Sequence, residues 1–165
     1  MALNKENMTP SITVAHRYRS ISLAAAQRIA NAALDEAVRL GISANAAVVD
    51  RAGTLIAFLR MPDASLHSAE TAMDKAYTAA SFRFPTSGWL DALANFPATV
   101  QQNILQRPRL VIFGGGIPIE VDNEVIGAIG VSGGSIEQDE RCAAAGVSAL
   151  NDCERLDQGS SGGAS

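Results

Sequence analysis

The chain has 165 residues, of which 47% are hydrophobic and 18% charged, a balance typical of one globular domain with a sizeable core. The formal net charge of −4 and the isoelectric point near 5.1 argue against nucleic acid or an anionic membrane as the main partner. No apolar run approaches the length of a membrane-spanning helix, and the first residues lack the pattern of a secretory signal. We therefore expect a cytoplasmic location.

The first half of the chain predicts two long helices and a hairpin. Residues 1–19 have no clear period, and we interpret them as an N-terminal arm. Apolar residues then recur at helical spacing over Ser22–Leu40. The runs Ala46–Val49 and Thr54–Leu59 flank a turn sequence and predict two antiparallel strands. A second long helix is expected from Ser65 to about Phe82. Its small residues share one stripe, along which a sheet or helix can approach closely: Ala69, Ala72, Ala76 and Ala80.

The second half predicts two short helices, further strands and a final helix. Prolines place the short helices near Trp89–Ala94 and Ala98–Leu105. Ser135 and Gln138 form a capping-box signal for the final helix. Three apolar runs separated by turn residues predict adjacent antiparallel strands: Leu110–Phe113, Ile117–Val121 and Val125–Val131.

This order of elements predicts an α+β fold, within the broad α/β class, in which an antiparallel five-stranded sheet is covered by helices. We expect a single domain over residues 20–155, followed by a flexible tail over 156–165. The triplet Gly114–Gly116 lies between two strands, so it is not the fingerprint of a dinucleotide-binding fold. Cys142 and Cys153 lie about three helical turns apart and are expected to be reduced thiols.

Four segments carry a resemblance to a known family: SLAAAQRIANAALDEAVRLG, AVVDRAGTLIAFLRMPDA, DKAYTAASFRFPTS and FGGGIPIEVDNEVIGAIGVSGGSIEQDERCAAAGVSAL. Together they cover roughly residues 20 to 150 and resemble the GlcG/HbpS-like haem-binding family, which includes the C-terminal domain of PduO-type corrinoid adenosyltransferases. The resemblance implies a profilin-like sandwich, assembly into a homo-oligomer and a role in a small-molecule catabolic operon. It implies haem, a related tetrapyrrole or iron as the ligand. A few relatives are thought to be hydrolytic or deaminating enzymes of aromatic degradation.

Haem requires an axial ligand, usually His, Cys, Met or Tyr. The resemblance implies a haem-ligating His in or near the first helix, but Ser22–Leu40 contains none. His16 lies just upstream in the arm, and His67 opens the second helix. We therefore name His16 and His67 as candidate haem ligands. The structural alternatives are a surface residue of the arm and an ordinary residue of the first helical turn.

A second hypothesis is a cofactor-free enzyme of the hydrolase or deaminase type that acts on an acidic small molecule. Thr71 and Asp74 follow His67 at helical spacing, so Asp74 can orient His67 or act with it. The candidate catalytic residues are therefore His67, Asp74 and Lys75.

Two further residues in family-like segments are candidates for binding a ligand. Arg60 ends a strand and can bind a carboxylate with two hydrogen bonds, and Thr86 follows the second helix. With Lys75, Arg60 would suit an acidic substrate or haem propionates. The structural alternative is that such residues form salt bridges across an oligomer interface.

Two more features are candidate ligand sites. Glu137 and Glu140 share one helix face, and such ExxE pairs are proposed to bind iron in relatives. Their structural alternative is a favourable interaction with the positive end of the helix dipole. The turn of Gly114, Gly115 and Gly116 permits a ligand to approach the backbone closely. We expect this turn to meet the polar face of the second helix of a neighbouring subunit.

Overall fold

A computed structural model of the protein describes residues 15–159, with side chains described for residues 15–150. Along the chain lie α1 (Leu23–Arg39), β1 (Asn45–Asp50), β2 (Leu55–Arg60), α2 (Leu66–Phe82), the 3₁₀ turn η1 (Thr86–Gly88), α3 (Trp89–Ala94), α4 (Ala98–Ile104), β3 (Gly116–Val121), β4 (Glu124–Ser132) and α5 (Ile136–Gly159). The mixed α+β class is confirmed. Residues 1–14 of the predicted arm and 160–165 of the predicted tail lie outside the described residues.

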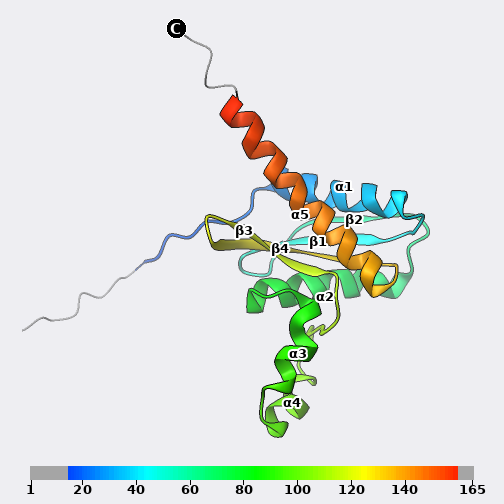
Figure 1. The fold of residues 1–165 in the computed structure, drawn as a ribbon, viewed down its shortest axis with the longest axis vertical. Helices are drawn as coiled ribbons and strands as arrows, with labels where there is room; N and C mark the ends of the chain where they lie inside the picture. The colour runs from blue at the N-terminus through cyan, green and yellow to red at the C-terminus, as the bar shows by residue number, and fades with distance from the viewer. Residues whose placement is uncertain (1–14, 160–165) are drawn as a thin grey trace, which may run out of the picture.

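The strands form one antiparallel sheet in the order β2–β1–β4–β3. Two hairpins are thus joined through the central pair of β1 and β4. Helices α1 and α5 lie together on one face of the sheet, and α2 covers the other face (Figure 1). Because both faces are covered, β1 and β4 are buried over almost their whole length. The turn at Asp122 and Asn123 has positive φ at both residues, as a two-residue hairpin favours.

The sheet has four strands, so the prediction of five strands is wrong. The error lies in Leu110–Phe113, which is apolar but forms no strand. Arg109 turns the chain with a φ of 65°, and the N–H of Val111 donates to the hydroxyl of Thr78 at 3.0 Å. A side chain of α2 therefore takes the place of a neighbouring strand as the backbone's partner. An apolar run by itself does not distinguish these two cases.

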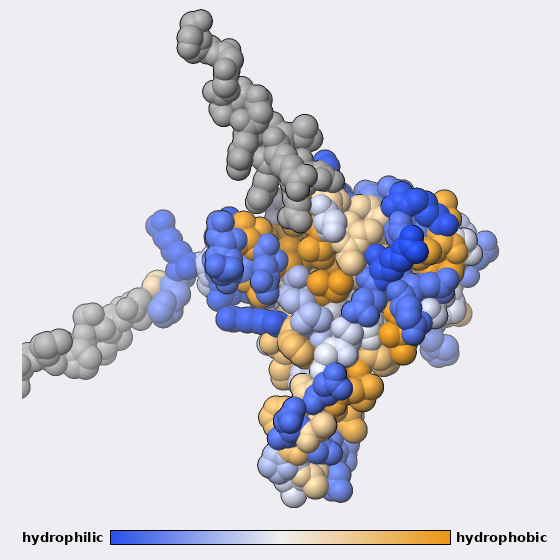
Figure 2. All heavy atoms as spheres, in the orientation of Figure 1, coloured by the Kyte–Doolittle hydropathy of each residue, from blue (hydrophilic) through white to orange (hydrophobic). Residues whose placement is uncertain are grey.

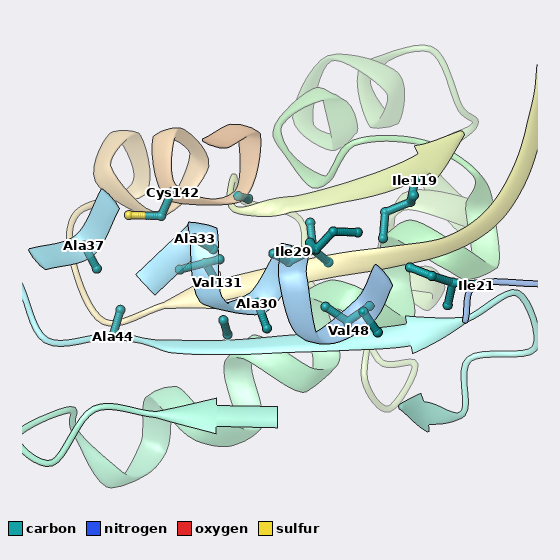
Figure 3. Packing of buried hydrophobic residues seen from close by; sticks show 14 of the residues in the cluster. Ile21, Ile29, Ala30, Ala33, Ala37, Ala44, Val48, Ile119, Val131 and Cys142 are labelled. Carbon is teal, nitrogen blue, oxygen red and sulfur yellow. The ribbon is translucent and has the colours of Figure 1, made fainter. Parts of the chain in front are cut away.

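The larger hydrophobic core lies between the sheet and the helices α1 and α5. It brings together Ile29 and Ala33 from α1, Val48 from β1 and Cys142 from α5 (Figure 3). A Cβ added to Gly146 would lie 2.8 Å from the carbonyl oxygen of Ile29. The two helices thus pack at a distance that larger side chains would prevent.

The opposite face of the sheet is covered by the small residues of α2. Buried alanines of α2 pack on residues of β1 and β4: Ala72, Ala76, Ala79 and Ala80 on Ala47, Val49 and Ala128. A Cβ added to Gly130 of β4 would lie 2.1 Å from the carbonyl oxygen of Ala72. The predicted stripe of small residues therefore faces the sheet, where backbone meets backbone.

The starts of two helices, α1 and α5, are fixed by side-chain caps. The Ser22 hydroxyl accepts the N–H of Ala25 at 3.2 Å at the start of α1. At the start of α5, the N–H of Ser135 donates to Gln138 Oε1 at 2.9 Å, and the N–H of Gln138 donates to the Ser135 hydroxyl at 3.3 Å. This reciprocal pair is the predicted capping box.

The short helices α3 and α4 project from the body of the molecule (Figure 1). Trp89 is buried at their base, where its ring packs edge-to-face on Phe82 with the centroids 4.6 Å apart. Much of the projecting surface is apolar (Figure 2), and its exposed side chains include Leu90, Phe96 and Leu105. Among the described residues, no helix is long and apolar enough to cross a membrane.

Candidate functional site

A buried ion pair joins α2 to α5 beneath the glycine triplet. The Nζ of Lys75 donates to Asp139 Oδ2 at 2.7 Å and to the carbonyl oxygen of Val131 at 2.9 Å. The other carboxylate oxygen of Asp139 accepts the N–H of Gly134 at 2.9 Å. The ring of Phe113 lies 4.9 Å from the same ammonium group. Both charged groups are therefore partnered in a place that water does not reach.

The environment of Lys75 suits a structural role. Burial lowers the pKa of its ammonium group below the ordinary value of 10.5, while the hydrogen bond and charge of Asp139 oppose that shift. Glu140 opposes it as well, through its charge. Because the Lys75 side chain is 0% exposed, no substrate reaches Nζ in this conformation.

The glycine turn packs on α2 of its own chain. Gly115 has a φ of 110°, and a Cβ added there would lie 2.8 Å from both Lys75 Nζ and the carbonyl oxygen of Val131. The buried hydroxyl of Thr86 accepts the N–H of Gly116 at 2.9 Å. A Cβ on Gly114 would meet Glu140 Oε2 at 2.9 Å. The space beside the glycine backbone, where we expected a ligand, is thus occupied by side chains of the same subunit. Thr86 is one of them.

The three predicted catalytic residues do not converge. His67 is exposed in the first turn of α2, where its carbonyl oxygen accepts the hydroxyl of Thr71 at 3.0 Å. Asp74 is partly exposed and accepts Nε of Arg109 at 2.8 Å. Lys75 lies on the buried face, about 12 Å along the helix axis from His67. This arrangement offers no shared point where an acid and a base could act on one substrate.

The remaining ligand-binding candidates also lie apart. Arg60 donates to the carbonyl oxygens of Pro62 at 3.2 Å and Ala64 at 2.6 Å, so it holds the turn between β2 and α2. His16 is exposed in the extended segment before α1. Neither residue contacts the ion pair of Lys75.

The ExxE pair lies at the start of α5. Glu137 accepts the hydroxyl of Ser135 at 2.8 Å, and hydrogen bonds, first from its own backbone and then from Ser135, lower the pKa of its carboxyl group. Glu140 is partly buried beside the glycine turn. Within the described residues, no group of three or more His, Cys, Asp or Glu side chains is placed to hold a metal ion. Iron binding by Glu137 and Glu140 stays a prediction.

The sequence interpretation missed the residues that complete these contacts. Asp139 neutralises Lys75, and Phe113 covers it. Thr78 holds the returning segment, since its hydroxyl donates to the carbonyl oxygen of Arg109 at 2.8 Å. Asp139 lies with Glu137 in the first turn of α5, where acidic residues are common and usually exposed to solvent. Its position in the sequence therefore did not indicate a buried partner for Lys75. One feature of the sequence could have indicated that Lys75 is buried: it is adjacent to Ala76, which belongs to the stripe of small residues that faces the sheet.

Comparison with known proteins gives a consistent result. The chain is 38% identical over 124 residues, which are 75% of this chain and 87% of its relative, to the "uncharacterized 15.0 kDa protein in dhaT-dhaS intergenic region" of Citrobacter freundii. The crystal structure of the PduOC:heme complex matches with a TM-score of 0.73 and 34% identity, over 80% of this chain and 96% of that one. The crystal structure of HbpS matches with a TM-score of 0.75 and 33% identity, over 83% and 94%.

The family model described as "Haem degrading protein HbpS-like" matches residues 21–148. This range contains the sheet, the buried pair of Lys75 and Asp139 and the glycine turn. The matched region thus spans nearly all of the folded domain and agrees with the resemblance drawn from the sequence motifs. The chain therefore belongs to the HbpS-like family.

Proposed function

We propose that the protein binds haem and works as a cytoplasmic homo-oligomer. The observation that carries the proposal is its likeness, at 34% identity over 80% of the chain, to a solved complex of PduOC with haem. The chain also belongs to a family whose model is described as "Haem degrading protein HbpS-like", and this supports haem as the ligand. Haem supplies an iron centre that accepts axial ligands and can exchange electrons.

The two histidines fit the chemistry of an axial ligand. Both His16 and His67 are exposed, and within residues 15–150 neither imidazole forms a hydrogen bond. An apolar side chain lies close in sequence to each: Tyr18, 61% exposed, near His16, and Leu66, 80% exposed, beside His67. A free imidazole next to exposed apolar surface suits a planar, mostly apolar ligand. One of these two histidines supplies the axial bond.

The test is a haemin titration of the purified chain, followed by the Soret band. Coordinated haem is expected to give a sharp and shifted band with saturable binding. His16→Ala and His67→Ala, each alone, are expected to differ, because only the variant that removes the ligand abolishes the shift. Absence of saturable binding to the wild type would contradict the proposed function. A double variant with the wild-type spectrum would instead show that Cys, Met or Tyr is the ligand.

Self-association is proposed from the exposed apolar surface of α3 and α4, where Leu90 is 62% and Leu105 is 53% exposed. Light scattering at micromolar concentration is expected to give a mass that is a multiple of 17.2 kDa. A single species of the monomer mass would remove this part of the proposal and leave haem binding to be judged by its own titration.

A further inference from the structure

A cleft lies at the C-terminal end of α2, at the opposite end of this helix from His67, and neither Lys75 nor Asp139 lines it. Arg51, which does line it, lies 4.9 Å from the ring centroid of Tyr18, two residues from His16. It consists of two adjoining hollows that share Tyr77 and Ser81 as lining residues. One hollow, of about 230 Å³, opens towards the turn between β1 and β2. The other, of about 150 Å³, opens towards the segment that returns from α4 to the glycine turn. The two hollows differ in chemistry.

The hollow beside the hairpin turn is polar. Arg51 lines it from the turn, and Arg83 lines it from the residue that ends α2. Arg83 adopts a left-handed conformation with a φ of 54°, and within residues 15–150 its guanidinium forms no hydrogen bond or ion pair. Arg51 is paired with Glu124. This half of the cleft therefore offers one unpaired and one paired guanidinium group.

The second hollow is mostly apolar. Its walls include Phe82 from α2 and Pro108 and Leu110 from the returning segment. Arg107 lies at its edge and, within residues 15–150, is likewise without a partner. The cleft thus has apolar walls in one hollow and the guanidinium groups of Arg51 and Arg83 in the other, and Arg107 adds a cation beside the apolar walls.

Tyr77 stands between the two halves. Its ring lies against the hairpin turn at Gly53, where an added Cβ would come within 2.8 Å of the ring carbons. The guanidinium of Arg109 stacks on the same ring at 3.8 Å from its centroid. Arg109 uses Nε for Asp74, and its two terminal nitrogens form no bond within the described residues. Tyr77 is therefore held in place by its neighbours before any ligand arrives.

The charges around the cleft favour an anion. Four of the thirteen Lys and Arg residues of an acidic chain gather here: Arg51, Arg83, Arg107 and Arg109. Glu124 and Asp74 neutralise two of them, which leaves a local excess of about two positive charges. The end of α2 contributes roughly −0.5 of a charge, so the excess remains positive.

We propose that this cleft binds a small carboxylate with an apolar body, of the size and shape of an aromatic acid. The carboxylate would be held by the guanidinium of Arg83, which can donate two parallel hydrogen bonds. The apolar body would lie across Tyr77 against Phe82 and Leu110. Each hollow is smaller than the roughly 300 Å³ at which pockets for larger ligands begin. Neither His16 nor His67 lines either hollow, and the proposed occupant is a metabolite-sized acid.

Benzoate is the probe, added to the haem-free full-length protein. Binding is measured by titration calorimetry and by fluorescence of Trp89, the only tryptophan, whose ring touches Phe82 of the cleft wall. We expect saturable binding of benzoate with a change in this fluorescence. Benzamide has the same body without the charge and is expected to bind much more weakly. Inorganic phosphate has the charge without the body and is expected to compete poorly.

Variants locate the site. Arg83→Gln is expected to weaken benzoate binding about tenfold, since it removes the charged hydrogen-bond donor to the carboxylate. Arg107→Gln removes a positive charge beside the apolar hollow and is expected to weaken binding by a smaller factor. Ser81→Leu adds bulk to both hollows without changing charge and is expected to abolish binding. The matched control is Arg28→Gln on α1, across the sheet, which should leave affinity unchanged.

Three results would overturn the proposal: no saturable benzoate binding to the wild type, equal binding of benzamide, or equal affinity in all variants. If Arg83→Gln fails to fold, Arg107→Gln and Ser81→Leu decide the question. None of these outcomes depends on whether the protein also binds haem, so the two proposals fail separately.

Discussion

The ammonium group of Lys75 lies 2.7 Å from the carboxylate of Asp139, and both side chains are almost completely shielded from water. Through this contact α2, on one face of the sheet, is bonded to the first turn of α5, which covers the other face. The same Asp139 accepts the N–H of Gly134, and Lys75 donates to the end of β4 at Val131. One pair of charges thus fixes the point where sheet, glycine turn and two helices meet.

Breaking this pair from one side is expected to be costly. Lys75→Met should lower the free energy of unfolding by about 3–5 kcal/mol, because it leaves Asp139 buried without a counter-charge. The double variant Lys75→Met with Asp139→Asn should recover much of this loss, since Asn can still accept the N–H of Gly134. Urea unfolding of the three proteins measures both effects.

The control for that experiment is Asp74→Asn, which breaks the partly exposed pair with Arg109. Its effect should be no more than about 1 kcal/mol. If Lys75→Met is no more destabilising than Asp74→Asn, the buried pair does not have the structural role described above.

Gly115 is expected to tolerate no side chain. Gly115→Ala should destabilise the protein by more than about 2 kcal/mol. The positive φ costs an Ala on the order of 1–3 kcal/mol of backbone strain. In addition, the new methyl group would lie too close to Lys75 and to the carbonyl oxygen of Val131. Gly41→Ala is the matched control. Gly41 also has positive φ, at 67°, but nothing lies within 4 Å of an added Cβ. Thermal unfolding of both variants is the measurement, and a loss in Gly115→Ala no larger than that in Gly41→Ala would contradict the packing argument.

Stability at high pH should depend on Cys142. Burial, aided by the charges of Asp139 and Glu36, raises the pKa of this thiol from 9.0 to about 11. Between these two values the unfolded thiol ionises while the native thiol keeps its proton. The unfolded state then binds fewer protons, so stability falls as the pH rises.

The measurement compares the wild type with Cys142→Ala by urea unfolding between pH 9 and pH 11. The wild type is expected to lose on the order of 1–2 kcal/mol more than the variant over this window. Other groups that titrate there are common to both proteins and cancel. Parallel pH profiles would mean that the native thiol ionises as readily as the unfolded one.

The hydroxyl of Thr78 is expected to hold the segment that returns from α4. It donates to the carbonyl oxygen of Arg109 and accepts the N–H of Val111. Thr78→Val keeps the shape but leaves both backbone groups unpaired, and should lower the free energy of unfolding by about 1–3 kcal/mol. Thr78→Ser keeps the hydroxyl and should cost less. Amide hydrogen exchange at Val111 should speed up only in the Val variant.

Local patterns in the sequence determined most of the secondary structure. The period of apolar residues, the capping pair of Ser135 and Gln138 and the turn at Asp122 and Asn123 each depend on residues that are close in the chain. Such patterns can be recognised in the sequence without knowing which distant segments come into contact. The family, too, followed from the order of short motifs, and the match over residues 21–148 agrees with it.

Only the tertiary structure decided which polar side chains meet. Lys75 and Asp139 are 64 residues apart, and the sequence around either residue does not predict their contact. Leu110–Phe113 has the composition of a strand, but the hydroxyl of Thr78 satisfies its backbone. The cations of the α2 cleft come from three segments: the hairpin turn, the helix end and the chain that returns from α4. Contacts between distant segments depend on how helices and sheet pack, and that packing is a property of the whole chain rather than of any window within it.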